Sequence, residues 1–594
     1  MNIGQILLWL CLLSSVLASI SGVLGLKRAD WARVGRFSSV AVSSLSSSAL
    51  VVLVLAFLRD DFSLRYVALH SCYDLPSVYK LTAVWAGQEG SLLFWLWVLS
   101  AFSTTFLLRN RDRLSDGALP VLSLVQTFFC LLVLRSSPFP KLPFVPEDGR
   151  GLNPLLKSPW MVLHPPALYV GYIGFTVPFA LSLAGVASGD VGWMGRSKRW
   201  SLFSWTFLTL GILTGMKWSY VVLGWGGYWA WDPVENASLM PWLTATAFLH
   251  SPPRRMSWSF FLVVITFELT IFGTFLARSG FVSSVHAFSR SPLGYYFLAF
   301  IVLSGGSAGW VGFRGRRKER SGGGTMFLGG LVSCALCLVT FFGTIFPAVS
   351  ELLSGRRMVL GPGFFNTIFA PSGLFVFFLF GICRSAKGLK SPIPLGLSVL
   401  SLYLMLRLGA RGLYPISAAL FGGFALGNIL LQVHRSLRSS DFGRLGGDLV
   451  HLGMIIFTFG VYCSSLGTEE NVEDVGLGDD FRFGGYNFTL EGFSPEPKRG
   501  AMLLRAKLRV KEGREEFTLS PGMEFYRGGE TLHKVEVRSG LLKDLHVAMT
   551  DVSRDAASFY LKVIPGTSFI WSGGYLVLAG ALVSLIRRKD AAFR

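Results

Sequence analysis

The sequence predicts an all-α polytopic membrane protein of about 15 transmembrane helices, with a small periplasmic β domain inserted before the last helix. Three observations lead to this prediction. Of the 594 residues, 51% are hydrophobic and only 15% are charged, whereas a soluble domain carries roughly 25% charged residues. The apolar residues gather in runs of roughly 17–25 residues, which is long enough to cross a bilayer. Residues 466–566 break this pattern and alternate between apolar and polar side chains instead.

We expect fifteen membrane-crossing segments, with fourteen as the alternative count because some segments are short or rich in glycine. The first segment has neither a basic start nor a small-residue cleavage site, so we expect it to be retained. The expected segments are 3–26, 38–58, 91–108, 117–134, 166–187, 200–217, 235–250, 259–277, 293–313, 325–346, 364–383, 392–406, 413–433, 446–465 and 567–586.

The orientation follows from the basic residues in the connecting stretches. Alternate stretches, beginning with 27–37 and ending with 587–594, hold 27 Lys and Arg in 79 residues. The opposing short loops, beginning with 59–90, hold 14 in 122 residues. Because cytoplasmic loops carry the excess of Lys and Arg, the N-terminus is expected outside and the C-terminus inside. In a bacterial inner membrane the outer side is the periplasm.

The long insert falls on the outer side in this arrangement. Its alternating residues, such as 504–510, and its glycine pairs at 484–485 and 528–529 are typical of strands and turns. We therefore predict three parts: a bundle of 14 helices over 1–465, a periplasmic β-rich domain over 466–566, and a last helix with a cytoplasmic tail over 567–594.

The net charge of +20 invites the hypothesis of nucleic-acid binding. The basic residues lie in short loops between apolar runs, however, so they indicate membrane topology, and we expect no nucleic-acid partner. The pair Cys334 and Cys337 lies inside an apolar run with no following His. This context fits neither a zinc site nor a haem-attachment motif.

The strongest local feature is the outer segment 218–242, which holds five Trp and two Tyr in 25 residues. Gly226 and Gly227 permit close approach of the backbone to a large flat ligand. Asp232, Pro233 and Glu235 fit the N-cap, N1 and N3 positions of the next helix. Single Trp residues at a membrane interface are usually belt residues, but this density with paired glycines indicates binding of a flat ring.

Four of the eight His fall into two pairs by depth. His164 and His286 lie on the outer side, like the tryptophan-rich segment. His250 lies 18 residues after Asp232, or about 27 Å of helix, which places it near the cytoplasmic edge. His451 lies seven residues after Arg444, at a similar depth. Paired imidazoles from two helices are a normal way to hold a haem iron in a bundle.

Glu268 is an acidic residue inside segment 259–277. Carboxylates within a membrane are costly and are candidates for function by default. Two interpretations stay open: Glu268 belongs to a proton path, or a buried partner merely satisfies it.

The segment 225–242 resembles the tryptophan-rich "WWD" signature of the haem-handling proteins of cytochrome c maturation. Further stretches make the chain similar to the CcmF family, the large cytochrome c haem lyases, over nearly its whole length. These stretches are 66–71, 80–95, 164–166, 273–288 and 451–453.

The resemblance implies two haem locations. An outer haem, the substrate, would lie against the tryptophan-rich segment between His164 and His286. A b-type haem would be held within the bundle by His250 and His451. The residues expected to act on or contact the outer haem are Trp218, Trp225, Gly226, Gly227, Trp229, Trp231, Asp232 and Trp242.

The resemblance also implies the activity: covalent attachment of haem to the CxxCH cysteines of apocytochrome c at the periplasmic face, within a multi-subunit complex. The implied partners are a haem chaperone, thiol-handling and apocytochrome-presenting subunits, apocytochrome c, membrane lipid and a quinol. Two alternatives from other classes are a haem transporter and a b-haem quinol oxidoreductase without lyase activity. The sequence lacks the P-loop of a self-powered pump.

Overall fold

The computed structural model describes residues 2–282, 284, 291–315, 324–385, 391–407, 412–498, 500–526 and 529–587. These residues form two compact units. The first comprises residues 1–212 and 231–366, and the second comprises 213–230 and 367–589. Two helices, α9 (Trp193–Val222) and α14 (Pro362–Ser385), run from one unit into the other. The boundaries of these two units differ from the boundaries of the three parts that we expect from the sequence.

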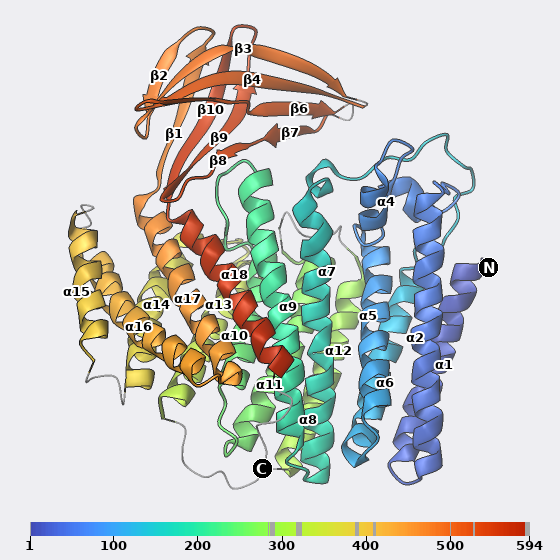
Figure 1. Cartoon of the computed structure of the whole chain (residues 1–594). Coiled ribbons are helices and arrows are strands. Elements are labelled where there is room, and N and C mark those ends of the chain that lie inside the picture. Colours follow the sequence, from blue (N-terminus) through green and yellow to red (C-terminus); the bar gives the residue numbers. More distant parts are fainter. Residues whose placement is uncertain are drawn as a thin grey trace. The chain divides into compact units, whose positions relative to one another are not determined.

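The first unit is entirely helical among its described residues (Figure 1). α1 packs between α2 and α6, and α10 packs against α11 and α13. Besides parts of α9 and α14, its elements are α1 (Ile3–Gly25), α2 (Ala29–Leu58), α3 (Arg65–His70), α4 (Ser77–Ala83), α5 (Gln88–Arg109), α6 (Arg113–Arg135), the 3-10 turn Pro154–Leu156, α7 (Pro159–Gly174), α8 (Thr176–Ser188), α10 (Pro233–Leu249), α11 (Met256–Ser279), α12 (Leu293–Arg314) and α13 (Gly324–Ser354).

The second unit joins helices to a β domain. Its helices include α15 (Pro392–Arg407), α16 (Leu413–Arg438), α17 (Phe442–Gly467) and α18 (Thr567–Arg587). Its strands are β1 (Glu469–Gly476), β2 (Asp480–Phe483), β3 (Tyr486–Lys498), β4 (Ala501–Glu512), β5 (Glu515–Leu519), β6 (Gly522–Tyr526), β7 (Thr531–Lys534), β8 (Glu536–Arg538), β9 (Lys543–Val552) and β10 (Ala556–Pro565).

The β domain predicted between the last two helices is confirmed (Figure 1). One sheet has the order β1-β10-β9-β8, and the other has the order β2-β3-β4-β6-β7 with β5 paired to β4. Both sheets turn apolar side chains into one shared core, which includes Leu490, Leu508, Val547 and Phe559. The turn expected at 484–485 joins β2 to β3 with both glycines at positive φ. Gly528, in the other expected turn, lies outside the described residues.

Within the described residues, twelve helices are long and apolar enough to cross a membrane. The predicted segment 166–187 is part of one such run, Pro159–Ser188, in which α7 and α8 meet at Phe175. α9, α10 and α15 match three further expected segments, but α10 and α15 have only 17 and 16 residues. The all-helical polytopic class is confirmed, and two short helices, α3 and α4, were not predicted.

Glycines bring α17 and α18 into backbone contact. Gly446, Gly453 and Gly460 recur every seven residues on α17, and Gly573 lies opposite Gly453 on α18. A Cβ at Gly453 would lie 2.7 Å from the carbonyl oxygen of Gly573. Close approach of this kind stabilises helix pairs where water cannot drive association. The α17–α18 pair therefore gives His451, on α17, a rigid support.

Candidate functional site

The tryptophan-rich segment begins in the second unit, with residues 218–230. After α9 ends at Val222, the chain turns at Gly224 (φ +77°) and Gly226 (φ +65°). L side chains rarely adopt such backbone angles. At Gly227, an added Cβ would overlap the Trp225 ring. The flat ring that approaches this glycine in the structure is therefore the indole of Trp225 itself.

Three contacts attach this half of the segment to its own unit. The Tyr220 hydroxyl donates to Asp544 Oδ2 on β9 at 2.9 Å. A Cβ at Gly226 would lie 3.1 Å from His546 Nδ1, so this glycine rests directly on β9. The hydroxyls of Tyr228 and Ser464 on α17 share a hydrogen bond of 2.7 Å. Because these partners lie hundreds of residues away in the sequence, no local pattern could have predicted them.

The segment continues in the first unit from Trp231, whose backbone is left-handed at φ +56°. This conformation costs a bulky residue about 1–3 kcal/mol and persists only where the surroundings enforce it. The indole Nε1 donates to Asn366 Oδ1 at 2.9 Å, and the ring stacks on Phe365 at 4.7 Å between centroids. Asn236 Nδ2 donates to the Trp231 carbonyl at 3.1 Å. These contacts fix the indole of Trp231.

The N-terminus of α10 follows the sequence prediction. Asp232 is the N-cap, Pro233 is N1 and Glu235 closes a capping box. Asp232 Oδ1 accepts from the Val234 N–H at 2.9 Å and from the Ser284 hydroxyl at 2.7 Å. Ser284 precedes His286 by two residues, so the chain leading to His286 reaches Asp232. His286 itself lies outside the described residues.

The remaining predicted Trp residues differ in how much ring surface they leave open. Trp218 is only 2% exposed and is therefore buried. Trp242 stacks on Trp205 at 5.3 Å, and its Nε1 donates to Thr209 at 2.9 Å. Trp225 and Trp229 are half-buried. Trp231 and Trp242 are half-buried too, so these four residues are partly exposed and only Trp218 is fully buried.

Three of the four predicted iron ligands share one hydrogen-bond arrangement. His164 Nδ1 lies 2.7 Å from the Gly211 carbonyl oxygen, His250 Nδ1 lies 2.8 Å from that of Thr246, and His451 Nδ1 lies 2.7 Å from that of Gly447. A carbonyl partner requires the proton on Nδ1 and puts the lone pair on Nε2. Axial histidines of metal sites are oriented in this way, so all three fit a haem iron.

His70 makes the same type of bond, and its other nitrogen is covered by the chain. Its Nδ1 lies 2.9 Å from the Tyr66 carbonyl oxygen. Its Nε2 packs against Gly87, where an added Cβ would lie only 2.5 Å away. A haem iron needs open space at Nε2. His70 is therefore a packing residue.

The two predicted ligands of the membrane haem belong to different units. His250 is the C-cap of α10 in the first unit. His451 lies on α17 in the second unit, where Phe380 meets its ring edge to face at 5.1 Å. The structure therefore shows the contacts of each histidine within its own unit. That the two histidines bind one haem stays a proposal.

No sequence pattern marks His546 as a buried residue beneath the tryptophan-rich segment. It is 0% exposed, and neither ring nitrogen has a hydrogen-bond partner among the described residues. Burial, reinforced by the nearby Lys562 ammonium, lowers the pKa of His546 to about 4. The imidazole is therefore neutral near pH 7, and a charge on it would oppose the contact with Gly226.

We predict that acid loosens this contact. Because the folded pKa of His546 lies below its ordinary value of 6.5, the stabilisation is present above pH 6.5 and falls as the pH approaches 4, by roughly 3 kcal/mol. Amide hydrogen exchange of β9 and of residues 213–230 measures this loss of stabilisation, after correction for the pH dependence of the intrinsic exchange rate. A His546→Leu chain should lose this dependence, and equal acid sensitivity in both chains would contradict the assignment.

Comparison with known proteins gives the family. A family model described as cytochrome C assembly protein matches residues 85–282. The cytochrome c-type biogenesis protein CcmF of Pseudomonas aeruginosa is 33% identical, over 99% of this chain and 96% of that protein. The chain belongs to the CcmF family. The CcmF of Escherichia coli is also 33% identical, over 98% of this chain and 97% of that protein.

The fold agrees with the CcmF family too. A solved structure named cytochrome c haem lyase CcmF matches with a TM-score of 0.82 and 26% identity, over 98% of this chain and 97% of that one. The family membership and the apolar helices make the chain a multi-pass membrane protein of cytochrome c biogenesis.

Proposed function

We propose that this chain is a cytochrome c haem lyase, which attaches haem to the CxxCH cysteines of apocytochrome c. The observation that carries the proposal is similarity to CcmF proteins over the full length, with the tryptophan-rich segment included. In the reaction each cysteine thiol adds across a haem vinyl group. The sulfur bonds to one vinyl carbon and the thiol hydrogen goes to the other, so the addition involves no net oxidation or reduction.

The outer residues bind and orient the substrate haem in this proposal. His164 and His286 ligate the iron until the histidine of CxxCH replaces one of them. The half-buried indoles of Trp225, Trp229 and Trp231 hold the ring plane. Asp232 supports this site by fixing the start of α10 and the chain before His286. Holding the vinyl groups beside the thiols is the protein's main contribution to the rate.

In the same proposal, His250 and His451 would hold a resident b-type haem. The N–H of each ring points to a carbonyl one helical turn earlier, which sets the ring plane and raises the basicity of Nε2. Such a group, when bound, supplies electrons that keep the substrate iron and the thiols reduced. A membrane quinol is the proposed source of these electrons.

The proposed partners follow from the same chemistry. A haem chaperone would deliver haem to the outer side, and thiol-handling subunits would present reduced apocytochrome there. Residues 466–566 offer a periplasmic β surface in this complex.

We also propose that the N-terminus and the β domain are periplasmic and that the C-terminus is cytoplasmic, in a bacterial inner membrane. The excess of Lys and Arg on alternate stretches supports this orientation. Cysteines introduced beside Pro233 and in residues 466–566 should react with a membrane-impermeant thiol reagent from outside. A cysteine beside Arg254 should react only from inside. Labelling of the Pro233 position from the cytoplasm would overturn the orientation.

The functional proposal itself is tested in a strain that lacks this protein. Its c-type cytochromes should lose covalent haem while delivery of haem to the outer face continues. Loss of that delivery would favour a transporter instead.

A further inference from the structure

Glu268 is a buried carboxylate in the middle of α11. It is 8% exposed, and its Oε2 accepts a hydrogen bond from the Ser304 hydroxyl of α12 at 3.1 Å. Its Oε1 is buried and has no hydrogen-bond partner among the described residues. A buried carboxylate with one unsatisfied oxygen is costly in a membrane domain. The hydrogen bond from Ser304 therefore satisfies one of the two carboxylate oxygens of Glu268 and leaves the other without a partner among the described residues.

The unsatisfied oxygen faces a glycine of α12. A Cβ at Gly305 would lie 3.8 Å from both Cδ and Oε1 of Glu268. Gly309 and Gly312 continue the same face of α12 at spacings of four and three residues. At Gly309 a Cβ would meet no atom within 4 Å. α12 thus has no side chain of its own on the face that Oε1 meets, and this face is open at Gly309, one turn further along, whereas the Phe260 ring covers it at Gly312.

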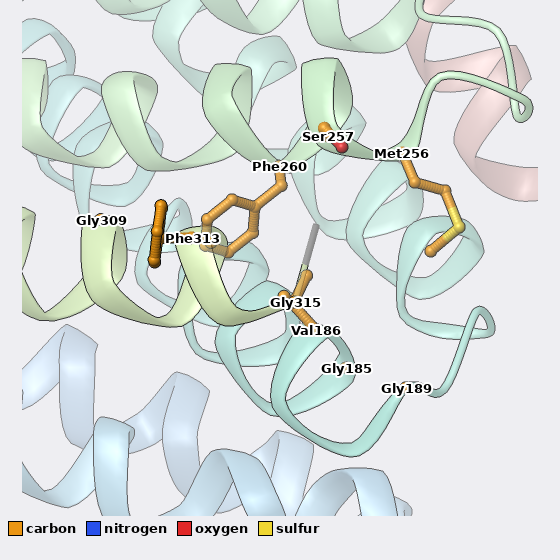
Figure 2. Close-up of a pocket in the computed structure, with 10 residues that line it drawn as sticks. Gly185, Val186, Gly189, Met256, Ser257, Phe260, Gly309, Phe313 and Gly315 are labelled. Carbon is orange, nitrogen blue, oxygen red and sulfur yellow. The ribbon is translucent and has the colours of Figure 1, made fainter. Parts of the chain in front are cut away.

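A pocket of about 360 Å³ occupies this open space. Gly309, Gly312 and Phe313 of α12 line it, together with Phe260 and Met256 of α11. Figure 2 shows the Phe260 ring reaching from α11 toward the α12 turn that carries Gly309 and Phe313. The pocket begins about 6 Å, or one helical turn, from the level of Gly305. It has room for several waters.

We propose that Glu268 is a proton-loading carboxyl, reached by water through this pocket. An isolated charge in the membrane domain is unfavourable, so the resting carboxyl is neutral. Water supplies the hydrogen-bond partner that Oε1 lacks, and it is the carrier that brings or removes the proton. A lipid acyl chain in the pocket would leave Oε1 unsatisfied. Water and protons are therefore the ligands that fit.

Infrared spectroscopy of the full-length protein tests this proposal. The protonated carboxyl of Glu268 should give a C=O stretching band that is absent from Glu268→Gln. On transfer to D₂O the band should shift quickly to lower frequency. In Gly309→Leu the added side chain fills the pocket, so the shift should slow by roughly tenfold or more, because packed side chains exclude water.

Gly306→Leu is the matched control, since Gly306 also has no atom within 4 Å of an added Cβ but does not line the pocket. In Gly306→Leu, the C=O band of Glu268 should shift at the wild-type rate. A band that survives in Glu268→Gln, or one that never shifts in wild-type protein, would overturn the proposal. Equal shift rates in the Gly309 and Gly306 variants would overturn the route through the pocket.

Discussion

Replacing both His164 and His286 by Ala is expected to reduce cytochrome c maturation by roughly a hundredfold or more, because axial ligation is directional and no neighbour can replace it. The single variants should be nearly as defective. The b-type spectrum of the purified protein should be unchanged, since His250 and His451 are its proposed ligands. Haem-stained c-type cytochromes from cells measure the first effect, and reduced-minus-oxidised spectra measure the second.

The Trp variants provide an internal contrast to this result. Ring stacking is spread over Trp225, Trp229 and Trp231, each contributing about 1–3 kcal/mol by analogy with base–aromatic stacking. Single Ala variants should therefore give graded losses, and combined variants larger ones. Added imidazole should partly restore the His variants by occupying the vacant iron position, but it should not restore the Trp variants. Wild-type maturation in the double His variant would contradict the outer site.

His250→Ala or His451→Ala is expected to remove the low-spin b-type spectrum of the purified protein or to convert it to a high-spin form. The physical reason is that a bis-His iron loses one axial nitrogen in either variant. A pyridine haemochrome assay types and counts the haem in each preparation.

Two other histidines serve as controls for this second result. His70 makes the same Nδ1 bond but has Gly87 against its Nε2. His434 is exposed at the end of α16. His70→Ala and His434→Ala should keep the wild-type spectrum. A normal low-spin spectrum in the His250 and His451 double variant would disprove the membrane haem assignment.

Features set by local chemistry were predictable from the sequence. The apolar runs predicted the helices because a bilayer requires them, and alternation predicted the β domain. Asp232, Pro233 and Glu235 predicted the capping of α10 because all three act within one turn.

Features set by distant contacts were not predictable. Nothing near Trp231 in the sequence indicates its left-handed backbone, which Asn366 and Phe365 support from more than 130 positions away. Likewise, the contact of Gly226 with His546 joins positions that only the folded chain brings together. The sequence also left Glu268 with two interpretations, and its unsatisfied oxygen above a glycine face favours the proton path.

The most direct test of the proposed lyase activity measures haem before and after its covalent attachment. In a strain that carries only the His164→Ala, His286→Ala double variant, haem bound non-covalently at the outer face and haem bound covalently to c-type cytochromes are measured together. The account predicts a normal or increased supply of outer haem and almost no covalent attachment. Normal attachment, or a parallel fall of outer and attached haem, would contradict it.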